Sequence, residues 1–144
     1  MVVISAKLKS LITDSSIAYL STVSHKGHPH IVPICFVLLD QNFYSLLDNK
    51  PKNVQILKLR RVQNIISNPK VALIVNHYED DWDKLWHVLI KGNGSIVANE
   101  LERRAAIKSL KQKYEQYLHM DVDLNPVIKI KPTNIVSWGA TTRK

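Results

Sequence analysis

The chain has 144 residues, a formal net charge of +8 at pH 7 and an apolar fraction of 45%. A chain of this length forms one domain, residues 1–144, and can bury a hydrophobic core without disulfides. The charged fraction of 22%, with only 4 glycines and 6 prolines, excludes collagen-like, linker-like and disordered chains. The basic excess points to an anionic partner without identifying it.

In the first half of the chain, the pattern predicts one helix and three strands. Apolar residues at helical spacing predict a short amphipathic helix over residues 3–13. Runs rich in β-branched residues predict strands over 17–23, 31–39 and 43–47, and Gly27 can supply the positive φ of a hairpin turn between the first two. Because the loops are short, these strands are expected to be antiparallel neighbours.

In the second half, helices and strands alternate. A period of 3.6 predicts a helix over 51–68, which ends before Pro69, and apolar runs predict strands over 71–78, 86–98 and 127–138. The second of these strands is expected to bend at Gly92 and Gly94. Asn99 and Glu102 form a capping-box pattern that opens a helix extending to about residue 118. This order predicts an α+β fold, a six-stranded antiparallel sheet curled into a small barrel with peripheral helices.

The single Cys35 excludes an intramolecular disulfide and a thiolate cluster, which fits a reducing compartment. The first residues do not resemble a signal peptide, since Lys7 and Lys9 follow the short apolar start rather than precede it. The longest apolar run, 31–39, is far shorter than the roughly twenty residues of a membrane-spanning helix. We therefore expect a cytoplasmic protein with no membrane partner.

Several enzyme classes lack their motifs here. The sequence has no dinucleotide-binding glycine fingerprint, no phosphate loop and no serine nucleophile elbow. Cys35 lies in a strand among apolar neighbours, as a buried inert thiol does. The string His25, His28 and His30 has no second ligand cluster, so we predict a polar hairpin tip and no metal site.

The strongest local anomaly is the segment 50–61, which holds five basic residues and no acid. These residues are Lys50, Lys52, Lys58, Arg60 and Arg61. Behind a strand end such a group can clasp a phosphate, and Asn64 lies one helical turn further on. The alternative is a solvated helix face.

The three tryptophans are the other notable feature. Trp82 lies within the only acidic cluster, residues 79–84, Trp86 follows that cluster, and Trp138 closes the last strand. They can be core residues, interface anchors or a wall for a planar ligand, and spacing does not choose among these. Nucleic-acid binding ranks below a small phosphorylated ligand, because aromatic residues are only 7% and RNA-binding signatures are absent.

The order of motifs resembles the pyridoxamine-phosphate-oxidase-like split β-barrel superfamily, and within it the deazaflavin (coenzyme F420)-dependent oxidoreductases. The likeness covers nearly the whole chain. It is carried by residues 27–36, 44–45, 48–52, 59–65, 68–73, 77–82, 85–86 and Gly92.

The resemblance implies a six-stranded split barrel that forms a homodimer, with two cofactor sites at the subunit interface. It places the cofactor ring against the strand of Val32, Pro33 and Ile34, and Trp82, Trp86 and Trp138 at the interface. The phosphate would be bound by Ser45, Lys50, Lys52, Arg60, Arg61 and Asn64. Because Lys50 and Arg61 are eleven positions apart, not all the basic residues need contact one phosphate.

The function implied by the resemblance is hydride transfer between coenzyme F420 or FMN and a small organic substrate. The alternative is a flavin- or deazaflavin-binding carrier without turnover. No catalytic residue is assigned, because such cofactors carry the chemistry themselves. Tyr44, His77 and His87 are the candidates for a proton donor.

Overall fold

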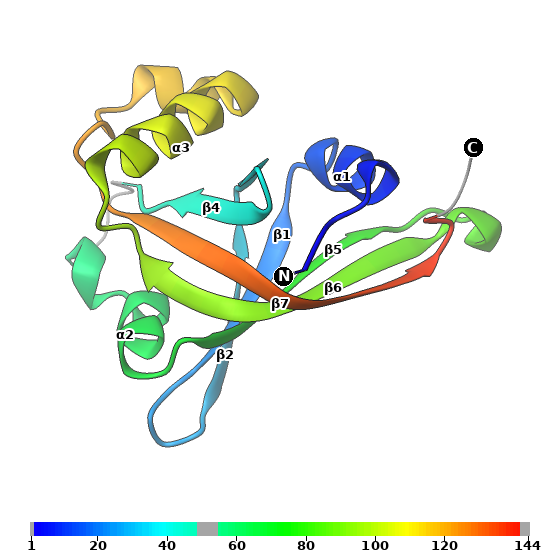
Figure 1. The fold of residues 1–144 in the computed structure, drawn as a ribbon, viewed down its shortest axis with the longest axis horizontal. Coiled ribbons are helices and arrows are strands. Elements are labelled where there is room, and N and C mark those ends of the chain that lie inside the picture. Colours follow the sequence, from blue (N-terminus) through cyan, green and yellow to red (C-terminus); the bar gives the residue numbers. More distant parts are fainter. Residues whose placement is uncertain (1, 49–54, 142–144) are drawn as a thin grey trace.

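A computed structural model describes residues 2–48 and 55–141. Its strands form one curled antiparallel sheet in the order β2-β1-β5-β6-β7-β4-β3 (Figure 1). The strands are β1 Ala18–Val23, β2 Pro29–Ile34, β3 Val37–Leu39, β4 Asn42–Leu46, β5 Lys70–His77, β6 Trp86–Ile96 and β7 Val127–Gly139. The α+β prediction is confirmed.

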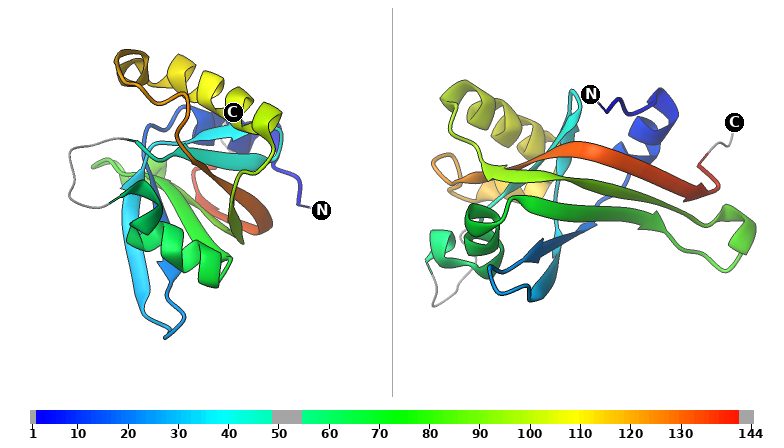
Figure 2. Two further views of the ribbon diagram at one scale, coloured as in Figure 1. Left: turned by 90° about the vertical axis from the view of Figure 1, so that its left-hand side faces the viewer. Right: turned by 60° about the horizontal axis from the view of Figure 1, so that its bottom comes forward.

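Helices lie at the margins of this sheet, as Figure 2 shows from two further sides. α2 packs against β1 and β6, while α3 packs against β3, β4 and β7. The α-helices are α1 Ala6–Thr13, α2 Arg60–Ser67 and α3 Glu100–Lys113, and the 3-10 turns are η1 Ile56–Lys58, η2 Trp82–Lys84 and η3 Glu115–His119. Within the described part of the chain, no helix is long and apolar enough to cross a bilayer.

The prediction of six strands is wrong by one, because the single strand expected over residues 31–39 divides at Cys35 and Phe36. Side chains of a distant helix bind the backbone at this break. The Tyr114 hydroxyl accepts a hydrogen bond from Phe36 N–H at 3.0 Å, and Lys113 Nζ donates to Phe36 O at 3.0 Å. The Phe36 side chain is fully buried. The backbone at Phe36 is therefore satisfied outside the sheet, and one run becomes two strands.

This break also curls the sheet. β2 and β3 form its two opposite edges, yet only two residues separate them along the chain. Two residues reach only about 7 Å, so the edges must approach each other at this corner. The result is a half-barrel in place of a flat sheet.

Two clusters of buried side chains lie on the two sides of the β3–β4 layer. The larger fills the inside of the curled sheet and includes Phe36, Phe43 and Ile90. The smaller lies under α3 and includes Tyr44 and Leu110. Each is lined by the alternate residues of the strands between them, as expected for a sheet covered on both faces.

Two helix boundaries differ from the prediction. α2 begins at Arg60, after the turn η1, and not at residue 51; residues 51–54 lie outside the described part. α3 ends at Lys113, and Tyr117 falls in the separate turn η3. In both places a periodic apolar pattern continues through a 3-10 turn, whose period is close enough to that of an α-helix to resemble it.

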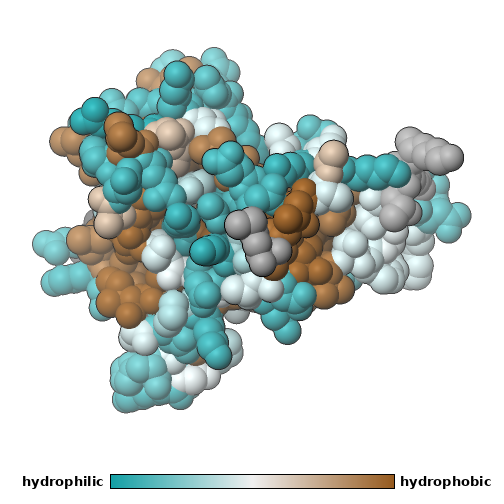
Figure 3. Space-filling view, viewed as in Figure 1, coloured by the Kyte–Doolittle hydropathy of each residue, from teal (hydrophilic) through white to brown (hydrophobic). Residues whose placement is uncertain are grey.

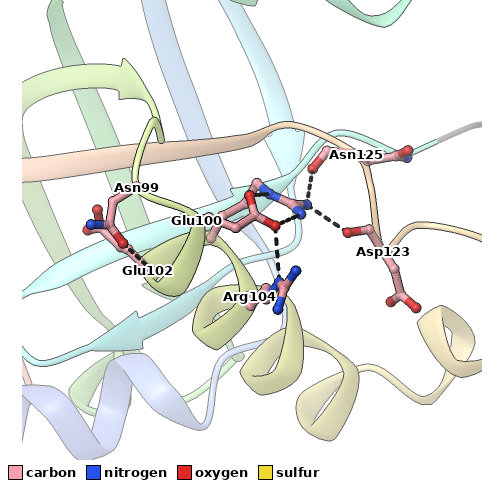
Figure 4. Close-up of polar contacts among 7 residues, drawn as sticks. Asn99, Glu100, Glu102, Arg104, Asp123 and Asn125 are labelled. Carbon is pink, nitrogen blue, oxygen red and sulfur yellow. Dashed lines mark hydrogen bonds and ion pairs between the residues drawn. The ribbon is translucent and has the colours of Figure 1, made fainter.

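The start of α3 forms half of the predicted capping box. Asn99 Oδ1 accepts a hydrogen bond from Glu102 N–H at 2.9 Å, but the Glu102 carboxylate binds Tyr44 and Lys129 instead of the cap backbone. Figure 4 shows this cap beside the ion pairs of Glu100.

Arg103, which follows Glu102, joins α3 to the following loop. Its guanidinium pairs with Glu100 and donates to the carbonyl oxygens of Asp123 at 2.7 Å and Asn125 at 3.1 Å. These bonds hold α3 against residues 121–125.

The glycine predictions are confirmed at two positions. Gly27 has a φ of +84° in the β1–β2 hairpin. At Gly92 the pairing of β6 with β7 shifts register, and a Cβ there would lie 2.4 Å from Lys131 O. The bend in β6 therefore depends on the missing side chain of Gly92.

The far ends of β5, β6 and β7 extend away from α2 and α3 as an arm that ends at η2 (Figure 1). We call residues 78–85, which connect β5 to β6 at its tip, the arm tip. Most side chains of the arm tip are exposed.

Candidate functional site

The first turn of α2 combines several features of an anion-binding site. α2 opens at Arg60 with no side-chain cap, so its first backbone N–H groups are available to a ligand. A helix N-terminus attracts negative charge through these N–H groups and the helix dipole. Arg60 and Arg61 add two guanidinium groups to the same turn.

Arg61 is the residue in this turn whose bonding is incomplete. Its Nε is buried and has no hydrogen-bond partner within residues 2–48 and 55–141. Burial lowers the pKa of the guanidinium, while the charges of Asp48 and Tyr117 oppose that shift. A buried, unpaired N–H of a charged group is costly, so a bound anion at this position would stabilise it.

Arg60 is exposed and faces the β1–β2 hairpin. It lines a groove of about 630 Å³ between α2 and that hairpin, together with Lys26, His28 and His30. None of the residues lining this groove is Asp or Glu. The groove extends the basic surface away from Arg61, which is consistent with the prediction that not all basic residues contact one phosphate.

Two residues predicted at the phosphate already have partners within the chain. Asn64 is 2% exposed, and its Nδ2 donates to Thr22 Oγ1 at 2.9 Å. The Ser45 hydroxyl donates to Cys35 O at 2.8 Å. Both side chains join neighbouring elements of the fold in this structure, and Lys50 and Lys52, the other two predicted residues, lie outside the described part of the chain.

β2 carries the three residues predicted to face the cofactor ring. Ile34 is buried in the main core and Val32 packs against that core, whereas Pro33 lies on the opposite face and is exposed. Their side chains therefore do not form one surface. β2 is an edge strand, however, so alternate backbone N–H and C=O groups along it have no partner strand. Polar atoms of a ligand can bind these backbone groups.

The surface around α2 is apolar as well as basic. Figure 3 shows hydrophobic residues, in brown, around α2 and between it and α3. Leu57 and Ile66 are 51% and 64% exposed there. A ligand with both an anionic group and a flat apolar body would match this combination.

Trp82 and Trp86 lie at the opposite end of the sheet from Arg61. Trp86 is 8% exposed and packs in the core against His77, and Trp82 is 71% exposed on the arm tip. α2 reaches β6 at Gly94, eight residues from Trp86, which is about 26 Å along a strand. Within one chain the tryptophans do not meet the basic turn.

Sequence reasoning missed a group of side chains beside the β2–β3 corner. Tyr117 is buried, hydrogen bonds the Cys35 side chain and lies near Arg61, and burial raises the pKa of its hydroxyl. Lys113 lies 3.9 Å from the centre of the Phe36 ring, and burial lowers its pKa to about 8. The helical pattern placed Tyr114 and Tyr117 on a core-facing side, but nothing in the spacing indicated Cys35 as their neighbour.

The candidate proton donors either are bonded within the chain or lie on the arm, away from the start of α2. Tyr44 donates to Glu102 Oε2 at 2.5 Å. Burial, and to a smaller extent the Glu102 carboxylate, raises the pKa of Tyr44. His77 pairs with Glu79, and His87 stacks on Trp138 with ring centres 5.4 Å apart, both on the arm. In the described part of the chain, no group of three or more His, Cys, Asp or Glu side chains is placed to hold a metal.

One comparison with known proteins identifies a family. A family model described as pyridoxamine 5'-phosphate oxidase matches residues 4–139. None of the curated proteins matches the chain.

Several solved structures share the fold at low sequence identity. A conserved hypothetical protein from Mycobacterium tuberculosis superposes with a TM-score of 0.77 at 18% identity, over 96% of this chain and 86% of that chain. HutZ, the heme storage protein from Vibrio cholerae, has a TM-score of 0.71 at 15% identity, over 92% of each chain. An FAD-binding protein from Mesorhizobium loti has a TM-score of 0.68 at 16% identity, over 93% and 94%.

Proposed function

Because the chain belongs to the pyridoxamine 5'-phosphate oxidase family, we propose that it is a cytoplasmic oxidoreductase that binds FMN or coenzyme F420. The bound cofactor supplies hydride transfer to or from a small organic substrate. The residues of the chain bind the cofactor, orient it and exclude water. The proposal rests mainly on one observation: the buried Nε of Arg61, at the start of α2, has no hydrogen-bond partner among the described residues.

The cofactor phosphate is proposed to bind at the first turn of α2. Arg61 offers the unpaired Nε, Arg60 offers a second guanidinium, and the uncapped N–H groups of the helix complete the set. Both cofactors carry a phosphate group, so this part of the site does not distinguish them. Lys50 and Lys52 remain proposed ligands, while Ser45 and Asn64 are proposed to contribute only by exchanging their present partners.

The flat ring is proposed to lie along the free edge of β2. Among Val32, Pro33 and Ile34, the backbone groups that face the free edge would bind the polar edge of the ring, because the side chains of these residues point to both faces of the sheet. The apolar surface around Leu57 and Ile66 would adjoin the ring and keep water from it.

A homodimer is part of the proposal, since one chain leaves a broad apolar face open. The outer face of the sheet, opposite the main core, exposes Tyr19 at 41%, Ile31 at 63%, Val136 at 51% and Trp138 at 54%. Exposed apolar patches of this kind mark protein interfaces. A second copy on this face would bring tryptophans from its own arm towards the cofactor.

The second candidate is a cofactor-binding carrier without turnover. It is favoured by the positions of the three candidate proton donors: Tyr44 is bonded to Glu102, and His77 and His87 lie on the arm. HutZ, a heme storage protein of the same fold, is a precedent for binding as the whole function.

Titration with four ligands tests the binding proposal. FMN, riboflavin, coenzyme F420 and haem are each added to the purified protein while fluorescence or absorbance is followed. Saturable binding of FMN or coenzyme F420 is expected, with riboflavin at least tenfold weaker than FMN because it lacks the phosphate. Equal affinity for riboflavin and FMN would contradict the proposed phosphate site. Binding of haem and of no other ligand would contradict the proposed flavin or deazaflavin cofactor.

Turnover then separates the enzyme from the carrier. The reduced protein–cofactor complex is mixed under anaerobic conditions with a panel of enones, quinones and nitroaromatic compounds. Reoxidation faster than that of the free reduced cofactor supports the oxidoreductase. A complex that reacts with no member of the panel faster than free cofactor supports the carrier.

A further inference from the structure

The outer face of the sheet changes character along its length. Residues paired directly across antiparallel strands point to the same side. The registers therefore place Tyr19, Ile74, Leu89 and Val136 together on this face at its centre. The two ends on either side of this apolar centre carry opposite charge.

One end is basic and hollow. Lys70, at the start of β5, and Lys91, on β6, line a groove of about 650 Å³ beside Ser21, Asn93 and Thr133. No Asp or Glu lines it. We call this groove, which adjoins the end of α2 at Asn68, the lysine groove.

The other end is acidic and aromatic. Beyond His77 the arm tip carries Glu79, Asp80, Asp81 and Asp83 against the single Lys84, which lies 3.8 Å from Glu79 and 3.9 Å from Asp81. Its exposed rings are Tyr78 at 65% and Trp82 at 71%. The arm tip therefore has an excess of negative charge and exposed aromatic surface.

We propose that a second copy of the chain docks on this face antiparallel to the first, with the acidic arm tip of each copy in the lysine groove of the other. This inference rests on the homodimer of the proposed function and specifies its register. A two-fold interface needs a self-complementary surface, in which residue i meets residue j and j meets i. An apolar centre with ends of opposite charge has that property.

The strand lengths agree with this register. Ile74 is four residues from Lys70 and three from His77, so the two ends of β5 lie about 13 Å and 10 Å from it. A two-fold axis through the centre of the face near Ile74 superposes the arm tip of one copy on the region of Asn68 and Lys70 of the other. The two distances from Ile74 are similar, so the arm tip of each copy lies over the lysine groove of the other.

The same register has a consequence for the cofactor site. Asn68 follows the C-terminal end of α2, so a partner's arm tip in the lysine groove lies at the end of that helix opposite Arg61. Trp82, which is too far from Arg61 within its own chain, would then lie at the partner's α2, roughly 10 Å along the helix from its first turn.

Charge reversal at the two ends provides the test. One variant carries Asp80→Lys and Asp83→Lys, a second carries Lys70→Glu and Lys91→Glu, and a third combines all four. A control carries Lys9→Glu and Lys108→Glu, on α1 and α3 away from this face. The mass of each in solution is measured by sedimentation at low and high salt, with circular dichroism to check folding.

The wild type and the control are expected to dimerise, more weakly at high salt because the docking charges are screened. Each two-residue variant alone is expected to raise the dimer dissociation constant at least tenfold, because like charges then face each other twice. A 1:1 mixture of the two variants is expected to restore the dimer, and so is the four-residue variant, which also covers the case in which one variant fails to fold.

A monomeric wild type, dimers of either variant as tight as the wild type, or a mixture and four-residue variant that both stay monomeric would overturn the docking. Cofactor binding by the wild type is measured separately, by the FMN and riboflavin titration. Conversely, if the wild type binds no cofactor but the mixture of the two variants recovers the dimer, the docking proposal stands and the proposed function is rejected.

Discussion

Two arginines on two helices of this protein have opposite surroundings. Arg103 on α3 pairs with Glu100 and donates to the carbonyl oxygens of Asp123 and Asn125 (Figure 4). Arg61 on α2 is also largely withdrawn from water, yet its Nε has no partner among the described residues. In sequence both belong to an Arg-Arg pair at the start of a helix.

This difference indicates two roles: Arg103 is a structural cation, and Arg61 is a candidate ligand-binding residue. Arg103 is satisfied within the chain and joins α3 to the following loop. Arg61 keeps a donor unused, and the cost of a buried, unpaired donor is removed when an anion binds. The completeness of hydrogen bonding, and not the number of basic residues, makes Arg61 the candidate.

The largest expected effect is on cofactor affinity at Arg61. Arg61→Ala should raise the dissociation constant for FMN by about 10- to 150-fold, corresponding to about 1.5–3 kcal/mol for a charge-assisted bond to phosphate. Arg61→Lys should lose less, because it keeps the charge but not the planar donors. Fluorescence titration measures both, and an unchanged constant for Arg61→Ala would show that Arg61 does not bind the cofactor phosphate.

Arg103→Ala is the matched case, with an effect on stability in place of affinity. Loss of the bonds to two carbonyl oxygens should lower the free energy of unfolding by about 1–2 kcal/mol. Urea denaturation measures this change, and the FMN dissociation constant should stay within twofold of the wild type. A large loss of FMN affinity in folded Arg103→Ala would break the distinction between the two arginines.

A smaller effect is expected at Tyr44, which also lies in the α3 region. Tyr44→Phe removes the hydrogen bond to Glu102 but leaves Glu102 paired with Lys129, so the cost should be about 1 kcal/mol. Turnover, where present, should keep its rate and its pH profile. A rate that falls tenfold without loss of stability would instead make Tyr44 a proton donor.

Lys113 is an intermediate case between the two arginines. It donates to Phe36 O, no ion pair of Lys113 with a carboxylate is found in the described residues, and burial lowers its pKa to about 8 from an ordinary 10.5. Between about pH 8 and pH 10.5 the unfolded chain therefore holds a proton that the folded chain has lost. Stability rises with pH wherever the unfolded state binds more protons.

The resulting prediction compares the wild type with Lys113→Gln. As pH rises from 7.5 to 10, the free energy of unfolding of the wild type should increase relative to that of the variant, since only the wild type loses the unfavourable charge. Urea denaturation at both pH values measures the change. A difference that stays constant, or falls, would show that Lys113 is not held in a desolvated site.

Much of the fold could be predicted because local patterns dominate it. The positions of most strands, the turn at Gly27, the bend at Gly92 and the cap at Asn99 follow from period, backbone freedom and side-chain capping. The seventh strand could not be predicted, because the break at Phe36 depends on Tyr114 and Lys113, about eighty residues away. A pattern read over a few residues contains no information on such a contact.

The candidate site was predictable only in part. The segment of basic residues identified Arg60 and Arg61 from charge alone, and the structure describes both at the uncapped start of α2. The sequence did not show that Asn64 and Ser45 have partners at Thr22 and Cys35, or that Trp82 lies at the far end of the sheet. These facts depend on which strands pair, and strand pairing is a long-range property.

The sequence by itself determined the α+β class of the chain and the position of a basic turn, because composition, periodicity and charge are local quantities. Only the tertiary structure decided that the Nε of Arg61 has no partner among the described residues and which ends of the sheet carry opposite charge. The reason is physical: burial and hydrogen bonding are shared between residues distant in sequence, so Arg61 and Arg103 differ only after the chain has folded around them.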